Sequence, residues 1–520
     1  MKTRTTIIIV VVIAVIAALL VAGFLYLPTL QNKKVLVWGT TESLNAIFPA
    51  LARTYDTYIP CSAVFETLTR YKPNTTELLP SLATEWHAIS PMIWEFKLRS
   101  DVKFHDGTPF NASAVEFSLE RTVNDTDRPF GAIQLGRYFD YVEVVDDYTV
   151  RIHLKTPGHA GFPGMTAYCV TAIYSPTAYK NAGSDYMTKG VVGTGPYKFV
   201  SFAPAQEIVL EANRNYWDSE RTPKVDKLVF KQFNDPSALK LAIEKGEIDI
   251  AHRWMYSADV SALMENPDIV TVKGNDPYVI MLPLHNNMSY TNETKIRYAI
   301  AYSIDYDAIG AIVDSERAYG IMPPSWPYAY EVQRMFERNI TKAKELLSEA
   351  GYPNGLPESI QMYWCPDFGP AFQEIAVLIQ GNLAEAGIPI TLTSVQESTM
   401  LDYRAKGLMH MAMVRFTYTF ADPDYMCYYA MRSGSAYPKG FGYGYPEIDQ
   451  LMDAGAVETN TTKRIQIYRE IQEIFDEKDH LVYLFRSKAY LFHRKNVHGA
   501  YIDGAIYHNI AASLTQIEKD

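Results

Sequence analysis

The chain has 520 residues, too many for one compact core, and because domains commonly hold about 100–200 residues we expect two or three lobes. Hydrophobic residues make up 48% and charged residues 21%, the composition of a globular protein rather than a disordered one. The formal net charge of −11 and the lack of any Lys/Arg-rich run argue against a nucleic-acid partner, because such proteins need a basic face.

The first 34 residues predict a membrane anchor followed by a linker. Lys2 and Arg4 precede Ile7–Leu27, a run of 21 residues without a charge. A helix of that length just spans a hydrocarbon core of about 30 Å. The positive-inside rule then keeps Lys2 and Arg4 in the cytoplasm and places everything after Leu27 on the extracellular or periplasmic side. The alternative is a cleaved signal peptide, and the chain is exported in both cases.

Two further features agree with export. Seven N-x-S/T sequons, which predict a glycoprotein, start at Asn74, Asn111, Asn124, Asn287, Asn292, Asn339 and Asn460. The cysteines number four, an even count that suits an oxidising compartment. One bridge in each lobe would join Cys61 to Cys169 and Cys365 to Cys427, and four buried free thiols are the alternative.

Strand and helix patterns alternate along the exported part, which indicates α/β lobes. Val35–Trp38 predicts a first strand, and Trp94–Arg99 shows the period-two alternation of another. Past a turn that contains His105, the sequence predicts a helix capped by Asn111 or Ser113. Three later helices are predicted over Thr294–Ile304, Thr341–Ala350 and Lys463–Glu477.

An ordered series of motifs covers about 450 residues. The motifs are LLPSLATEW (78–86), WEFKLRSDVKFHDGTPFNASAVEFSLER (94–121), GTGPYKF (193–199), NRNYW (213–217), AIEKGEIDI (242–250), KIRYAIAYSID (295–305), LLSEAGYPNG (346–355), FADPD (420–424), YPEIDQLM (445–452) and RIQIYREIQEI (464–474). Together they resemble the dipeptide/oligopeptide type of ABC-transporter solute-binding proteins, extracellular family 5.

The resemblance implies an α/β, two-lobe periplasmic-binding-protein (Venus-flytrap) fold. Lobe I would hold residues 35–275, with an extra subdomain at about 75–190, and the returning segment 485–520. Lobe II would hold residues 276–484. The chain would cross between the lobes near Val270–Leu284 and again near Leu481–Leu491, and these two segments would form the hinge.

The resemblance also implies a function without bond chemistry. The protein would capture a small solute between its lobes and deliver it to the permease and ATPase subunits of an ABC importer. The cargo would be a peptide, with an oligosaccharide as the alternative, and a transporter-independent solute sensor is the competing class of function. The sequence contains no convincing metal motif, phosphate loop or nucleophile elbow, so we predict no enzyme, no cofactor and no metal site.

One family residue is replaced in this chain. In the family, an aspartate in the segment matching Phe416–Asp424 binds the free amino group of the peptide. The family pattern aromatic-x-x-Asp-x-x-Asp-Pro places Thr419 at that position, whereas Asp422 belongs to the following turn and is predicted to be structural. Because a buried ammonium group needs a compensating charge, this replacement weakens the peptide interpretation.

The candidate ligand-binding residues lie in the segments that the resemblance places at the cleft. Aromatic rings suit sugars and apolar peptide side chains equally well, and an arginine fork suits a ligand carboxylate. Half of the rings would instead belong to the core, because alternate residues of a strand face opposite ways. The candidates are Gly39, Thr40, Thr41, Arg253, Trp254, Tyr256, Tyr363, Trp364, Arg415, Phe416, Tyr418 and Thr419.

Overall fold

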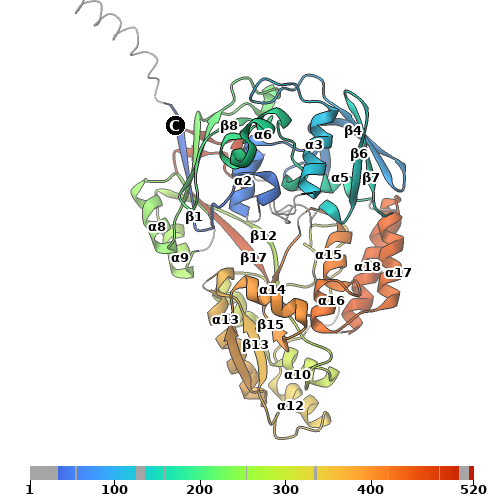
Figure 1. Cartoon of the computed structure of the whole chain (residues 1–520). Coiled ribbons are helices and arrows are strands. Elements are labelled where there is room, and N and C mark those ends of the chain that lie inside the picture. Colours follow the sequence, from blue (N-terminus) through green and yellow to red (C-terminus); the bar gives the residue numbers. More distant parts are fainter. Residues whose placement is uncertain are drawn as a thin grey trace, which may run out of the picture.

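The computed structural model describes residues 33–52, 55–124, 135–156, 160–252, 255–332, 336–369, 371–418, 420–478, 481–502 and 514–520. Figure 1 shows two lobes connected by a pair of long strands. We call the part built on the eight-stranded sheet lobe I and the part built on the three-stranded sheet lobe II. The membrane span expected over Ile7–Leu27 lies outside the described residues, and none of the described helices is long and apolar enough to cross a membrane.

The eight-stranded sheet organises lobe I. Its order is β16 (Val414–Phe416), β12 (Ile269–Pro283), β17 (Leu481–Arg494), β11 (Ile250–His252), β1 (Val35–Thr40), β10 (Lys227–Gln232), β9 (Glu207–Ala212) and β8 (Tyr197–Ala203). The strand predicted at Val35–Trp38 is β1, which pairs in parallel with both β10 and β11. Leu36 and Trp38, which share one face of β1, are buried, whereas Val35 and Val37 on the other face are half-buried.

Two helices cover one face of this sheet beside the crossing strands. Helix α8 (Pro236–Lys245) begins where the Asp235 carboxylate accepts a hydrogen bond from the Ala238 amide and ends at Gly246 in a left-handed conformation. Helix α9 (Ser257–Glu265) follows β11 and packs its Leu263 into the same apolar cluster as Phe492 of β17. The start of α9 is therefore held at the edge of lobe I that faces lobe II (Figure 1).

A second, four-stranded sheet also belongs to lobe I. Its order is β4 (Ala83–Ser90), β5 (Ile93–Leu98), β7 (Thr149–Leu154) and β6 (Phe139–Asp146). Helix α3 (Ala112–Val123) is capped by Asn111, as predicted, whose side chain accepts a hydrogen bond from the Ala114 amide. The remaining elements of lobe I are α2 (Tyr55–Val64), β2 (Thr69–Tyr71), β3 (Leu78–Pro80), α5 (Phe162–Met165), α6 (Pro176–Ala182), α7 (Tyr186–Lys189), β18 (Val497–His498), β19 (Glu518–Lys519) and the 3-10 turns Pro49–Leu51, Cys169–Thr171, Gly183–Asp185 and Ser219–Arg221.

Lobe II is a smaller α/β unit. Its parallel sheet has the order β14 (Ile390–Ser394), β13 (Ile360–Trp364) and β15 (Met411–Ala412). The three predicted helices appear as α10 (Thr294–Ser303), α12 (Ile340–Glu349) and α18 (Thr461–Lys478). The other helices are α11 (Tyr306–Val313), the 3-10 turn Pro366–Phe368, α13 (Ala371–Ala386), α14 (Glu397–Lys406), α15 (Pro423–Met431), α16 (Ala436–Phe441) and α17 (Pro446–Val457).

Strands β12 and β17 connect the lobes and occupy the ranges expected for the two crossings. They pair antiparallel from Ile269 opposite Arg494 to Pro283 opposite Leu481, with irregularities between Asn275 and Val279 and between Ile280 and Met281. At about 3.3 Å per residue, such strands are long enough to take part in both lobes. Irregular pairing lets a strand bend.

A second contact between the lobes surrounds the start of α15, and we call it the α15 junction. From lobe II it contains Ala421, Asp422, Asp424, Ala456, Arg464 and Tyr468, and from lobe I it contains Tyr71, Arg137, Ala160 and Gly161. The Ala160 amide donates to the Ala456 carbonyl at 3.0 Å, and the Ala421 amide donates to the Tyr71 hydroxyl at 3.0 Å. These hydrogen bonds join the residues before α15 and the end of α17 to lobe I.

The cysteines differ from the bridged arrangement considered above. All four are buried free thiols, so the predicted bridges Cys61–Cys169 and Cys365–Cys427 are absent. Burial raises the pKa of the Cys61 thiol, and the hydrogen bond between Cys61 and Cys169 raises it further. Cys365 instead lies 3.6 Å from an oxygen of Asp367. Free thiols suit these positions because cysteine packs as a small apolar side chain.

Candidate functional site

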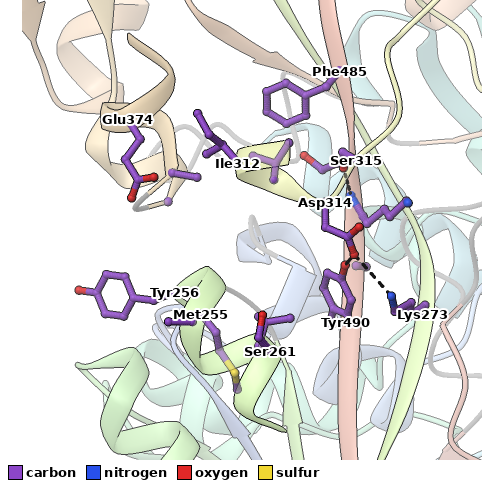
Figure 2. Close-up of a pocket in the computed structure, with 18 of the residues that line it drawn as sticks. Met255, Tyr256, Ser261, Lys273, Ile312, Asp314, Ser315, Glu374, Phe485 and Tyr490 are labelled. Atoms are coloured by element: carbon purple, nitrogen blue, oxygen red, sulfur yellow. Dashed lines mark hydrogen bonds and ion pairs between the residues drawn. The ribbon is translucent and has the colours of Figure 1, made fainter. Parts of the chain in front are cut away.

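A pocket of about 560 Å³ lies between the lobes beside the crossing strands, and we call it the interlobe pocket. Figure 2 shows side chains from α9 along one wall, side chains from lobe II along the opposite wall, and Asp314, Tyr490 and Lys273 at the strand ribbon. Ligand sites of small-molecule-binding proteins span about 300–1,000 Å³, so this volume suits a small solute.

The lobe I wall is built by the N-terminal part of α9 and the residues just before it. Met255, Tyr256 and Ser261 face the pocket. Tyr256 keeps 44% of its surface exposed, an unusually open position for a large ring. An open aromatic ring at the edge of a pocket is available to a ligand, because its flat face and its hydroxyl offer both apolar and polar contact.

The floor of the pocket carries a paired charge. Asp314 ends α11 in a left-handed conformation and receives hydrogen bonds from the Tyr490 hydroxyl and from Lys273, whose Nζ lies 3.4 Å from Oδ2. The hydrogen bond from Tyr490, together with Lys273, holds the Asp314 pKa below its usual range. Asp314 is therefore ionised and already neutralised by the protein.

The lobe II wall is mainly apolar, with small and aliphatic side chains beside two phenylalanine rings, and carries one free carboxylate. Phe368 and Phe372 are buried behind it, with ring centroids 5.4 Å apart. Glu374, in the first turn of α13, is exposed and lines the pocket, and its carboxylate makes no hydrogen bond or ion pair with any described residue.

A buried polar cluster lies where parallel strands β1 and β11 end. The Thr40 hydroxyl donates to Asp56 at 2.6 Å, and Nδ1 of His252 lies 3.2 Å from the other Asp56 oxygen. All three side chains are buried, yet His252 also lines the pocket. Ligands of open α/β sheets commonly bind at the carboxyl ends of strands, so this cluster holds the lobe I edge of the site in place.

The structure brings one of the described sequence candidates, Tyr256, into the pocket lining. Arg253, Trp254 and Thr419 lie outside the described residues. Thr40 anchors the buried cluster at the strand end rather than facing the pocket, and Thr41 next to it is half-buried. The roles of Arg253, Trp254, Thr41 and Thr419 in ligand binding stay predictions.

Gly39 has a packing role that the sequence did not indicate. A Cβ at Gly39 would lie 2.5 Å from Ile248 and 2.6 Å from Leu239, so its small size allows α8 to approach β1. On lobe II, Tyr363 and Trp364 are half-buried at the end of β13, where Tyr363 packs edge-on against Tyr403.

The candidates on and after β16, the edge strand of the eight-stranded sheet, are packed outside the lining of the interlobe pocket. Phe416 is buried against Tyr437, and Tyr418 is fully buried against Trp326 with ring centroids 4.6 Å apart. Arg415 places its guanidinium 4.7 Å from the centre of the Phe368 ring, directly behind the pocket wall. Arg415 is thus the member of this segment nearest to the interlobe pocket, and a ligand contact by any of the three stays a prediction.

The sequence reasoning missed Asp314, Phe368, Phe372, Glu374 and Tyr490. One signal for the lobe II residues is the strand β13 that ends at Tyr363 and Trp364, because ligand sites form just beyond the carboxyl ends of parallel strands. Tyr490 lay in a predicted crossing segment. No local pattern marked Asp314, whose position depends on the pairing of β12 with β17.

Similarity searches agree with this architecture. The model of "Bacterial extracellular solute-binding proteins, family 5 Middle" matches residues 77–438. The glutathione-binding protein of Salmonella typhi is 26% identical over 506 residues, covering 91% of this chain and 96% of that protein. The dipeptide-binding protein of Escherichia coli is 26% identical over 508 residues, covering 90% of this chain and 92% of that protein.

A solved structure extends the similarity to three dimensions. The ABC transporter-associated periplasmic binding protein of Helicobacter pylori, in complex with the peptide STSA, is 26% identical to this chain. The match has a TM-score of 0.77 and covers 94% of this chain and 99% of that protein. Two lobes, a crossing ribbon and a pocket between them define a periplasmic-binding-protein fold. The chain belongs to the bacterial extracellular solute-binding proteins, family 5.

Proposed function

We propose that this chain is the substrate-binding component of an ABC importer and captures a short peptide or another small solute in the interlobe pocket. The pocket itself is the observation that carries the proposal, because its walls come from α9 of lobe I and α11 and α13 of lobe II. A solute that touches both walls binds the closed form more tightly than the open form and so favours closure. The permease subunits would then recognise the closed shape.

Several finer features belong to the same proposal. Lobe I would comprise residues 35–275 and 485–520, and lobe II residues 276–484, with β12 and β17 acting as the hinge. The apolar run Ile7–Leu27 would anchor the protein to the membrane with the lobes on the extracellular or periplasmic side. The sequons would carry glycans on that side. The protein would bind its cargo without converting it.

The cargo is proposed to be a peptide, supported by relatives whose names state dipeptide or glutathione binding and by the peptide held in the Helicobacter pylori structure. An oligosaccharide is the second candidate, favoured by the ring Tyr256 at the pocket edge, because flat rings pack well against sugars. Neither alternative needs a cofactor.

Calorimetric titration of the purified chain tests the proposal when a pocket variant is compared with a matched control. Ala311 lines the pocket on α11, so Ala311→Trp would fill part of the cavity and should lower the affinity for a bound peptide or sugar at least about 10-fold. Ala384→Trp, on exposed surface of α13 outside the pocket, should leave affinity unchanged.

Mass spectrometry of solute that co-purifies from the native host would identify the cargo used in that titration. Equal affinity of Ala311→Trp and the parent chain would contradict the assignment of the pocket. Genes for two permeases and two ATPases beside this one would support an importer, and their absence would favour the solute sensor.

A further inference from the structure

An arginine of lobe I contacts lobe II at the α15 junction. Arg137 lies in the turn just before β6, and its Nη2 is 3.4 Å from Oδ2 of Asp424 in the first turn of α15. Its guanidinium carbon lies 3.0 Å from the centre of the Tyr428 ring, one turn further along the same helix. Figure 1 shows α15 of lobe II next to the four-stranded sheet of lobe I. One lobe therefore supplies a cation, and the other supplies a carboxylate and an aromatic face that both attract it.

This contact is largely removed from solvent. The side chains of Arg137 and Asp424 keep 19% and 7% of their surfaces exposed. The ring centre of Tyr138 lies 4.6 Å from the guanidinium carbon, so each lobe contributes an aromatic ring to the surroundings of Arg137. Oδ1 of Asp424 accepts a hydrogen bond from the Tyr468 hydroxyl at 3.1 Å, which orients the carboxylate within lobe II. Because the pair is mostly buried, salt and water screen its attraction less than that of an exposed pair.

Arg137 differs from Arg464, the other arginine of the junction, in the position of its partner. Arg464 and Asp422 both belong to lobe II, so the distance between them does not depend on how the lobes are placed. Arg137 and Asp424 belong to different lobes, so a rotation of the lobes about β12 and β17 changes the distance between them. A cation–π contact requires the cation within about 6 Å of the ring centre, so a small displacement removes it. Opening the lobes therefore breaks the contact of Arg137 and leaves that of Arg464 intact.

We propose that Arg137, Asp424 and Tyr428 form an interlobe latch that favours the closed arrangement of the lobes before cargo binds. The inference rests on the proposed function, in which the closed form holds the cargo. The described lining of the interlobe pocket contains none of these three residues, so the latch acts without touching cargo in that pocket. Loss of the guanidinium should lower the ratio of closed to open molecules about 5- to 30-fold. The apparent affinity for cargo then falls with the closed fraction.

Small-angle X-ray scattering of the purified chain, freed of co-purified solute, tests the latch without a known cargo. Arg137→Met keeps a long side chain but removes the charge, and it should increase the radius of gyration because more molecules are open. Arg432→Met is the matched control. The Arg432 guanidinium lies 5.9 Å from the same Tyr428 ring but pairs with Asp453 inside lobe II, so its loss should leave the radius unchanged.

A second variant removes the contact from the lobe II side. Asp424→Asn keeps an acceptor for the Tyr468 hydroxyl but loses the charge that faces Arg137, and it should also increase the radius of gyration. The double variant should have the radius of Arg137→Met alone, because both substitutions remove the same interaction. Far-UV circular dichroism checks that each variant is folded, and Asp424→Asn decides the question if Arg137→Met does not fold.

The radii of these variants separate the latch from the proposed function. Radii equal to that of the parent chain for both Arg137→Met and Asp424→Asn would overturn the latch and leave the proposed function intact. An increase for Arg432→Met as large as that for Arg137→Met would overturn it too, because Arg432 does not join the lobes. Expansion of Arg137→Met and Asp424→Asn alone, in a chain that binds none of the peptides and sugars tested, would support the latch and count against the proposed cargo.

Discussion

The α15 junction and the interlobe pocket differ in how their charges are balanced. At the junction, Arg464 donates two hydrogen bonds to Asp422, at 2.7 and 2.9 Å, and both residues are only 5% exposed. In the pocket, the Glu374 carboxylate is exposed and has no partner among the described residues. Both regions contain a carboxylate, but that of Asp422 is buried and paired, whereas that of Glu374 is exposed.

This difference distinguishes a charge that stabilises the fold from a charge that is available to a ligand. A buried ion pair that is complete within the protein fixes one arrangement of the chain, since removing either partner would leave an uncompensated charge. An exposed carboxylate at a pocket does not fix the chain in this way, because it forms its strongest interaction only when a ligand binds. We infer that the ion pair between Arg464 and Asp422 fixes the arrangement of α15 and α18 within lobe II, whereas the interlobe pocket holds the cargo.

The largest effect is expected from breaking the ion pair of the α15 junction. Asp422→Ala would leave the Arg464 guanidinium buried without its carboxylate and remove the cap that Asp422 provides to the Asp424 amide. The free energy of unfolding should fall by about 3–5 kcal/mol, measured by chemical denaturation. Asp453→Ala breaks the more exposed pair with Arg432 and should cost no more than about 1 kcal/mol. A similar small loss for both variants would refute the structural role of the junction.

A smaller effect is expected from the close approach of the two lobes at Gly161. A Cβ at this position would lie 2.0 Å from Oδ2 of Asp422, so Gly161→Ala must push the lobes apart at the junction. The expected loss of stability is about 1–3 kcal/mol, with a larger radius of gyration in solution scattering. Gly381→Ala is the matched control, since nothing lies within 4 Å of its Cβ and alanine favours the helix by up to about 1 kcal/mol. An unchanged radius and stability for Gly161→Ala would contradict the contact.

Much of the fold could be predicted from the sequence where local signals agree with the final structure. The cap at Asn111 and the helix found as α18 were predicted because a cap residue or an apolar face identifies them locally. The α15 junction could be predicted only in part. The Asp422 turn had a local signal, whereas its partner Arg464 lies 42 residues away and no local rule connects them.

The site was predicted less well, for a reason visible at single residues. Tyr256 and Tyr418 have the same side chain and similar sequence signals, yet Tyr256 is exposed at the pocket and Tyr418 is fully buried against Trp326. A tyrosine ring offers apolar surface both in a core and at a pocket. The residue type alone therefore does not predict which of these two locations the ring occupies. Glu374 was missed because acidic residues are common in the first turn of any α-helix, so its presence there did not indicate a ligand site.

The smallest effect is expected from the charge at the pocket floor that is already paired. Lys273 and Asp314 keep 48% and 61% of their side-chain surfaces exposed, so solvent screens their attraction. Lys273→Met should change the free energy of unfolding by no more than about 0.5 kcal/mol, because Asp314 retains its hydrogen bond from Tyr490. Denaturant titration measures the stability. A loss above about 1 kcal/mol would place this pair with the α15 junction as a structural element. The contrast between the two regions would then lie in Glu374 alone.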